Sequence, residues 1–351
     1  MAANDIEAVL PILAAMVEGV MLVNAQGRIV LANPAARAMF HWPWAVEGRH
    51  YIEVVRQPDI SAQFAAALGG TPRPPAEVEL ERDRRRIYTA RAMPMPAERG
   101  GGAVLVLHDI TDLKHADQVR RDFVANVSHE LRTPLTAIRG YIEALSDDEG
   151  PAPADARKFL DIIARHTTRM ERLVRDLLRL ARLDAGQESL ALERLPLESV
   201  VAGVETEMQA LLVRKRQHLI RDFSSNAMTI QADPAKIHDV LRNLVENACN
   251  YGPEGSDIAI TARATETMLS LTVADRGPGI PDDDLPRIFE RFYRADRSRT
   301  TDPGGTGLGL AIVKHLIELH GGHASARHRE GGGAEVMVTL PNGGGTPPTT
   351  D

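Results

Sequence analysis

The sequence predicts a multidomain α+β protein with three folded parts in a row: a small N-terminal α/β module, a helical hairpin and a C-terminal α/β sandwich. Short apolar runs separated by polar turns indicate strands in the first part, and apolar residues at steps of three and four indicate helices in the second. Helix and strand patterns are mixed in the third. We place the domains at residues 1–112, 113–186 and 187–341, and expect a disordered tail at 342–351.

The composition excludes several classes of protein. With 351 residues, of which 43% are hydrophobic, the chain can bury two or three separate cores. A net charge of −7 argues against direct binding to nucleic acid. The single cysteine, Cys249, excludes an intrachain disulfide and fits a reducing compartment. Because no apolar stretch is long enough to span a bilayer, we expect a soluble cytoplasmic protein without a transmembrane segment in this chain. The alternative is association with the inner face of the plasma membrane through a membrane protein partner.

The N-terminal module opens with a predicted β-hairpin. Val20–Val23 and Ile29–Leu31 are apolar runs on either side of the polar turn Asn24–Gly27. A short helix follows from Pro34 to Phe40, after which Pro and Gly residues break the pattern. Further apolar runs predict strands at 77–80, 87–93 and 103–108.

Two amphipathic helices form the predicted hairpin. The first carries an apolar stripe made of Val124, Val127, Leu131, Leu135, Ile138, Ile142 and Leu145. The second keeps heptad spacing at Leu160, Ile163, Thr167, Met170, Val174, Leu177 and Ala181. Because two helices leave both stripes partly uncovered, we predict a homodimer in which two hairpins form a four-helix bundle.

The C-terminal part is predicted to be a sheet with helices packed on it. Helices are expected at 197–213 and 235–250, and a third opens at a glycine-rich segment and closes at Gly321–Gly322. Strands are expected at 218–223, 228–230, 258–262, 269–274 and 335–340.

His129 is a candidate nucleophile on the first hairpin helix. At 100° per residue it lies about 160° from Val127 and Leu131, so its ring faces solvent. Pro134 removes one backbone hydrogen bond and should bend the helix beside it. Glu130 can orient the imidazole or take its proton. Taken alone, this pattern equally describes a surface histidine near a tolerated bend.

Three features of the C-terminal part suit a magnesium nucleotide. Asn243 and Asn247 lie four residues apart on one helix face, and neutral oxygens of this kind suit Mg²⁺. Asp275 extends the buried face of a strand into Gly277 and Gly279, where a carboxylate can accept a hydrogen bond from an exocyclic amine such as that of adenine. Exposed asparagines and Asp-x-Gly turns are both common, so each feature alone also has a purely structural explanation.

The third feature is the glycine-rich segment Gly304–Leu310, which opens a helix. Backbone N–H groups at such a helix N-terminus bind phosphate. The segment is neither a P-loop nor a dinucleotide-binding fingerprint. Between the glycine motifs, residues 282–303 are charged and irregular around Phe289, Phe292 and Tyr293, which predicts a mobile lid over a ligand.

These residues, in this order, resemble the sensor histidine kinases of two-component systems. The family motifs correspond to Ser128–Leu135 (H box), Asn243–Ala248 (N box), Asp275–Ile280 (first G box), Phe289–Arg294 (F box) and Gly305–Leu310 (second G box). Five matches in the family order are far more specific than any one of them. The N-terminal module is similar to a PAS sensor domain, and the arrangement is similar to the cytoplasmic part of phosphate-regulon sensor kinases.

The resemblance implies a protein histidine kinase that uses ATP and Mg²⁺. In the family, the histidine at the position of His129 takes the γ-phosphoryl group, and the glutamate at Glu130 assists as base. The phosphoryl group then passes to an aspartate on the receiver domain of a response regulator. Thr133 matches the position that serves the reverse phosphatase activity. The implied Mg²⁺ ligands are Asn247 and Asn243. The implied nucleotide contacts are Asn243, Asn247, Tyr251, Asp275, Gly277, Gly279, Ile280, Gly305, Thr306, Gly307, Leu308 and Gly309.

Two other functions stay open on the sequence. One is an ATP-binding sensor scaffold that has lost autophosphorylation. The other is an ATPase outside phosphorelay, which has no use for an exposed histidine on a dimerising hairpin. The second hairpin helix also carries eight basic residues between Arg157 and Arg182, against three acidic ones. This excess fits either docking of an acidic response regulator or a solvated helix face.

Overall fold

The computed structural model describes residues 10–81, 85–96, 98, 100–147, 151–294 and 305–342. The chain divides into two compact units, Met1–Asp122 and Phe123–Asp351, and each has its own hydrophobic core. Apart from Asn342, the predicted disordered tail lies outside the described residues, as do residues 295–303 of the predicted lid.

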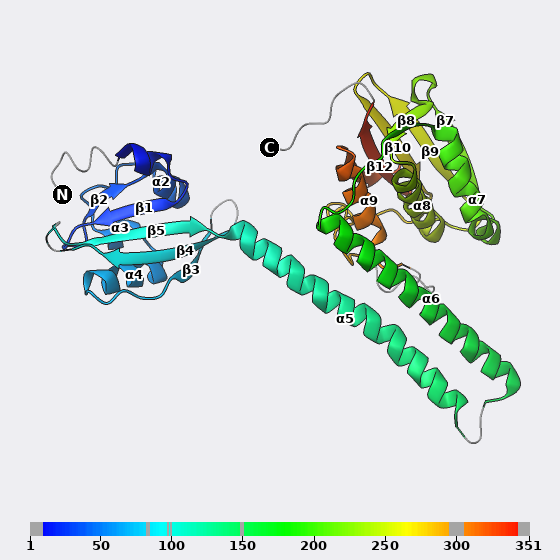
Figure 1. Ribbon diagram of the computed structural model, residues 1–351, viewed down its shortest axis with the longest axis horizontal. Helices are drawn as coiled ribbons and strands as arrows, with labels where there is room; N and C mark the ends of the chain where they lie inside the picture. Colours follow the sequence, from blue (N-terminus) through cyan, green and yellow to red (C-terminus); the bar gives the residue numbers. More distant parts are fainter. Residues whose placement is uncertain are drawn as a thin grey trace. The chain divides into compact units, whose positions relative to one another are not determined.

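The described part of the first unit forms a five-stranded antiparallel sheet in the order β2-β1-β5-β4-β3 (Figure 1). Its strands are β1 (Gly19–Val23), β2 (Ile29–Ala32), β3 (Ala76–Glu81), β4 (Arg85–Pro94) and β5 (Ala103–Asp109). All five strands, and the hairpin of β1 and β2, are confirmed from the sequence pattern. Their inward side chains, such as Met21 and Leu105, are fully buried.

Three helices lie between β2 and β3: α2 (Pro34–Phe40), α3 (Tyr51–Val54) and α4 (Pro58–Leu68). Asn33 starts α2, because its Oδ1 accepts hydrogen bonds from the N–H groups of Ala36 and Val20. The sequence pattern, which Pro and Gly residues break after Phe40, missed α3 and α4. Pro58 is the first residue of α4, a position that proline favours, and Phe64 of that helix is fully buried.

The hairpin consists of α5 (Thr111–Leu145) and α6 (Pro153–Asp184). Both predicted helices are confirmed, and α5 begins two residues after the end of β5. Pro134 lies inside α5 and is buried. No helix among the described residues combines the length and hydrophobicity needed to cross a membrane.

Apolar side chains occupy two faces of the hairpin. One face is open in the single chain: its side chains are each between 45% and 59% exposed, and they are Val124, Leu135, Ile142, Leu160, Val174 and Leu178. A second face, which the heptad pattern missed, buries Leu173, Leu180 and Leu183 in the core of the C-terminal part. The open face therefore still lacks a cover.

The C-terminal part is a two-layer sandwich (Figure 1). In the described residues, its sheet has the strand order β11-β12-β10-β9-β7, with β7 parallel to β9 and the other pairs antiparallel. The strands are β7 (His218–Phe223), β9 (Asp257–Ala264), β10 (Met268–Ala274), β11 (His323–His328) and β12 (Ala334–Pro341). Along β10, Leu269, Leu271 and Val273 are buried, as the alternation predicts.

Helices α7 (Leu197–Lys215), α8 (Pro234–Tyr251) and α9 (Gly309–Leu319) pack on this sheet, and all three were predicted. Strand β8 (Thr229–Ala232) pairs with β6 (Glu193–Pro196) instead of joining the main sheet. The sequence pattern missed β6 and β11, because neither carries a strong apolar run.

Candidate functional site

His129 is exposed on α5, as the helical phase predicts. The neighbouring Glu130 points toward α6 instead, where its Oε2 lies 2.9 Å from Nη2 of Arg169. Thr133 Oγ1 donates a hydrogen bond to the carbonyl oxygen of His129, one helical turn earlier. The hairpin thus presents an imidazole to solvent, and the carboxylate at the adjacent position is held by Arg169.

Asp275 lies where β10 ends, and its two carboxylate oxygens differ. Oδ1 accepts hydrogen bonds from the N–H groups of Gly277 (2.7 Å) and Ala334 (3.3 Å). Oδ2 has no hydrogen-bond partner among the described residues. Burial raises the pKa of the Asp275 carboxyl, against the two backbone hydrogen bonds, which lower it. One oxygen therefore anchors the carboxylate, and the other is available to a ligand.

Two glycines let the backbone close around Asp275. A Cβ atom on Gly277 would lie 2.6 Å from the carbonyl oxygen of Tyr251, at the end of α8. A Cβ atom on Gly333 would lie 2.1 Å from the carbonyl oxygen of Asp275, and Gly333 has φ +104°. Gly333, in the turn between β11 and β12, was not singled out in the sequence, although the run Gly331–Gly333 is a signal for such a turn.

The predicted amides lie on the half-buried face of α8. Asn243 Nδ2 donates to the carbonyl oxygen of Asp239 (2.8 Å), which leaves Oδ1 toward α9, 3.1 Å from where a Cβ atom on Gly309 would be. The amide of Asn247 has no hydrogen-bond partner in the described part of the chain. Nor does any group of three or more His, Cys, Asp or Glu side chains in the described ranges form a metal site. Amide oxygens on α8 are thus free to act as ligands.

The second glycine motif leads into α9. Thr306 is buried, and its Oγ1 accepts from the N–H of Leu308 (3.3 Å) and donates to Oδ2 of Asp176 on α6 (3.1 Å). Phe292 N–H donates to the carbonyl oxygen of Gly307 (2.9 Å). Phe292 packs in the core, with its ring centroid 5.7 Å from that of Phe123 on α5, so the predicted lid is held at this residue.

The remaining predicted residues surround these groups. Ile280 is half-buried, Leu308 is buried, and Gly305 is exposed. Tyr251 is 50% exposed at the end of α8. The structure thus brings together the predicted residues of α8, the first glycine motif and the start of α9. Within the described ranges, no hydrogen bond or ion pair joins His129 to this group.

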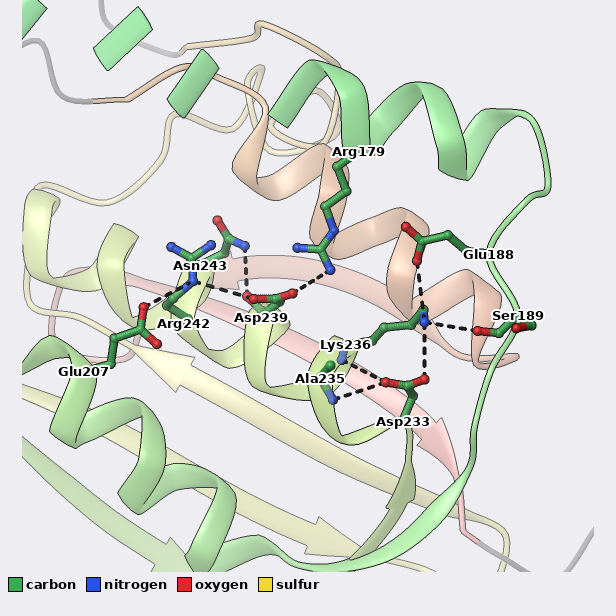
Figure 2. A network of polar contacts seen from close by, with 10 residues as sticks. All are labelled: Arg179, Glu188, Ser189, Glu207, Asp233, Ala235, Lys236, Asp239, Arg242 and Asn243. Carbon is green, nitrogen blue, oxygen red and sulfur yellow. Dashed lines mark hydrogen bonds and ion pairs between the residues drawn. The ribbon is translucent and has the colours of Figure 1, made fainter. Parts of the chain in front are cut away.

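A network of charged side chains holds α6 against α8 (Figure 2). Arg179 of α6 reaches Oδ2 of Asp239 (2.6 Å), one turn before Asn243. Arg242 lies 3.8 Å from Oδ1 of Asp239 and 3.9 Å from Oε1 of Glu207 on α7. Beyond the view, Arg172 pairs with Glu246 (2.5 Å). Three basic residues of α6, Arg169, Arg172 and Arg179, are therefore paired with acidic side chains of other helices.

The linker after α6 is tied to the start of α8 in the same view. Lys236 Nζ donates to the carbonyl oxygen of Ser189 (3.0 Å) and lies 3.5 Å from Oε2 of Glu188. It also pairs with Asp233, whose Oδ1 caps α8 by accepting from the N–H groups of Ala235 and Lys236. The helix that carries both amides is thus fixed at its N-terminus.

Three protein families match this chain. Residues 13–115 match the PAS fold, and residues 119–186 match the His Kinase A (phospho-acceptor) domain. Residues 232–344 match the histidine kinase-, DNA gyrase B- and HSP90-like ATPase family.

Curated relatives agree with these matches. The chain is similar to the sensor histidine kinase WalK of Bacillus subtilis, with 34% identity over 94% of this chain and 54% of the relative. It is also similar to the sensor protein kinase WalK of Staphylococcus aureus (strain Newman), with 33% identity over 93% of this chain and 54% of the relative. The chain therefore spans about half the length of these relatives.

A solved structure supports the fold. The histidine kinase ThkA, determined in complex with the response regulator TrrA, matches 92% of this chain and 95% of its own, with a TM-score of 0.53 and 23% identity. With a PAS fold, a phospho-acceptor domain and a histidine kinase-type ATPase domain in that order, the chain belongs to the sensor histidine kinases.

Proposed function

We propose that this chain transfers the γ-phosphoryl group of ATP to His129 and then to an aspartate of a response regulator. The observation that carries the proposal is the exposed His129 on a hairpin that packs against the domain holding Asp275, whose Oδ2 is free for a ligand. The proposed limits are 1–112 for the sensor, 113–186 for the hairpin and 187–341 for the ATP-binding domain.

Oδ2 of Asp275 would accept a hydrogen bond from the adenine amine, with Gly277, Gly279 and Ile280 around the base and Tyr251 at its edge. The phosphates would lie at the start of α9, against the backbone of residues 305–309. Asn247 and Asn243 would hold Mg²⁺ through their amide oxygens, which have no hydrogen-bond partner among the residues that the structure describes. When bound, Mg²⁺ supplies charge neutralisation to the phosphates.

In the proposed first step, an imidazole nitrogen of His129 attacks the γ-phosphorus. The bond to the β–γ bridging oxygen breaks, and ADP leaves. Glu130, once released from its ion pair with Arg169, would accept the proton from the other ring nitrogen, so the phosphorylated ring stays neutral. In the second step, a carboxylate oxygen of the response regulator attacks the phosphorus and the N–P bond breaks. Thr133 would orient water for hydrolysis of the resulting aspartyl phosphate.

The proposed function is tested by whether the protein becomes labelled by ATP and by the chemical stability of that label. Incubation with Mg²⁺ and γ-labelled ATP is expected to give a labelled chain whose label is lost in acid and kept in alkali, as a phosphorus–nitrogen bond requires. ATP labelled at the α-phosphate should leave the protein unlabelled. ATP binding without label would favour the sensor scaffold, and release of free phosphate without labelled protein would favour a plain ATPase.

We also propose that two chains join through the open apolar face of the hairpin. Replacing Leu160, which is 56% exposed, with aspartate is expected to raise the dimer dissociation constant by more than about 100-fold, because a charge then replaces apolar contact in both chains. Analytical ultracentrifugation over a concentration series measures this constant. Val213→Asp, at a 70% exposed site on α7, is the matched control. An unchanged constant in Leu160→Asp would contradict the proposal.

The proposed partner is the receiver domain of a response regulator, by analogy with ThkA and TrrA. A phosphate-linked signal and a membrane protein partner belong to the same proposal. The similarity of the domain arrangement to the cytoplasmic part of phosphate-regulon sensor kinases supports the phosphate-linked signal.

A further inference from the structure

Asp176 lies outside every motif of the family, yet it contacts Thr306. This residue belongs to the segment 305–309 that is proposed to bind the phosphates, which we call the phosphate loop. Oδ2 of Asp176 accepts a hydrogen bond from the hydroxyl of Thr306 (3.1 Å), and the same hydroxyl oxygen accepts a hydrogen bond from the N–H of Leu308 (3.3 Å). A chain of hydrogen bonds therefore runs from α6 to the residue that precedes α9. Thr306 itself is only 6% exposed, so its hydroxyl has few other partners to choose from.

Several contacts hold α6 in this place. Arg172 and Arg179 pair with Glu246 and Asp239 of α8 at 2.5 and 2.6 Å. Buried leucines add to the ion pairs, and they are Leu173, Leu180 and Leu183. Because these contacts lie on both sides of Asp176 along α6, its carboxylate is brought to Thr306 by the docking of the whole helix.

The charge of Asp176 opposes the ligand proposed for this loop. Burial raises the pKa of its carboxyl, while the hydrogen bond from Thr306 and the charges of Arg172 and Arg242 lower it. Glu246 adds a second negative charge nearby. A half-buried carboxylate beside a triphosphate is repulsive, and the repulsion grows with the charge of the ligand.

We infer that Asp176 is a positioning residue that lowers the affinity of the phosphate loop for nucleotide while α6 is docked, because its carboxylate engages Thr306 and repels phosphate. This inference rests on the proposed nucleotide site. Nucleotide binding and the docking of α6 then compete for Thr306. Binding of the phosphates therefore weakens the contact between the phosphate loop and α6, which belongs to the hairpin that carries His129.

Asp176→Asn in the full chain tests this inference, because it removes the charge and keeps an oxygen that can accept from Thr306. Calorimetric titration should show ATP binding about 3- to 10-fold tighter than in the wild type, the size expected for removing one partly screened charge near a polyanion. The gain should be smaller for ADP, and the affinity for adenosine should be unchanged. Asp161→Asn, at an exposed position of the same helix, is the control and should bind all three ligands like the wild type.

The size of the affinity change for ATP, ADP and adenosine separates an effect of charge from an effect on structure. Weaker or unchanged ATP binding in Asp176→Asn, or an equal change for adenosine, would overturn the inference. Asp176→Ala, checked by circular dichroism, provides a second variant without the carboxylate, and it should shift ATP binding in the same direction. A wild-type chain that binds no ATP would instead reject the proposed function.

Discussion

Replacing His129 with alanine is expected to abolish labelling by γ-labelled ATP, with a loss of at least about 10³-fold, as for other enzymes that lose their nucleophile. The imidazole is the exposed group next to Glu130, and alanine offers no nitrogen to form the N–P bond. Alanine also suits a helix, so α5 should persist. Quantitative autoradiography of the protein band over time measures the initial rate of labelling.

His115→Ala is the matched control for this prediction. His115 is another exposed histidine on α5, and it lies outside the H box. The control should label at the wild-type rate, and both variants should bind ATP with wild-type affinity. Normal labelling of His129→Ala would contradict the assignment of the nucleophile, and loss of labelling in both variants would point to damage of the helix.

Replacing Asp275 with asparagine is expected to weaken ATP binding about 10- to 100-fold, the range for losing a hydrogen bond to a charged group. Asparagine keeps one oxygen for the N–H groups of Gly277 and Ala334, so the local backbone should hold. Its amide nitrogen then faces the ligand and cannot accept from the adenine amine. Isothermal titration calorimetry measures the change, and the melting temperature reports on the fold.

Asp283→Asn serves as the control, because Asp283 is exposed and has no partner in the described part of the chain. It should leave the dissociation constant unchanged. Comparison with GTP sharpens the test. A guanine base carries no amine at the adenine position, so Asp275→Asn should narrow the preference for ATP over GTP. Equal loss for both nucleotides would place Asp275 away from the base.

The features of the fold that the sequence predicts are those that depend only on residues close together in the chain. The phase of α5 puts His129 in solvent because helical periodicity depends only on nearby residues. The strand β10 and its continuation into Asp275 follow from alternation in the same way. By contrast, α4 was missed because Pro58 has two opposite meanings, a break in a helix and its first residue, and only the tertiary packing of Phe64 decides between them.

The part of the site that the sequence does not predict comes from α6. The basic excess of that helix fits a regulator surface or a solvated face equally well, yet Arg169, Arg172 and Arg179 pair with acidic residues of α5 and α8. Asp176 and Thr306 lie 130 positions apart, and no periodic pattern links them. Such contacts depend on which face of one helix packs against another element. The composition and the spacing of residues do not determine this packing.

The close approach of Gly333 to the backbone of Asp275 limits which insertions and deletions the loop between β11 and β12 can accept during evolution. Hairpin loops usually tolerate insertions and deletions because they face solvent. Here, a longer or shorter loop between β11 and β12 would shift the backbone that passes within reach of the Asp275 carbonyl. An added Cβ atom at Gly331 or Gly332 meets no neighbour within 4 Å, but both residues have positive φ (+82° and +100°), which favours glycine. We therefore expect these glycines and the length of the loop to be inherited together with Asp275, the carboxylate proposed to bind the base.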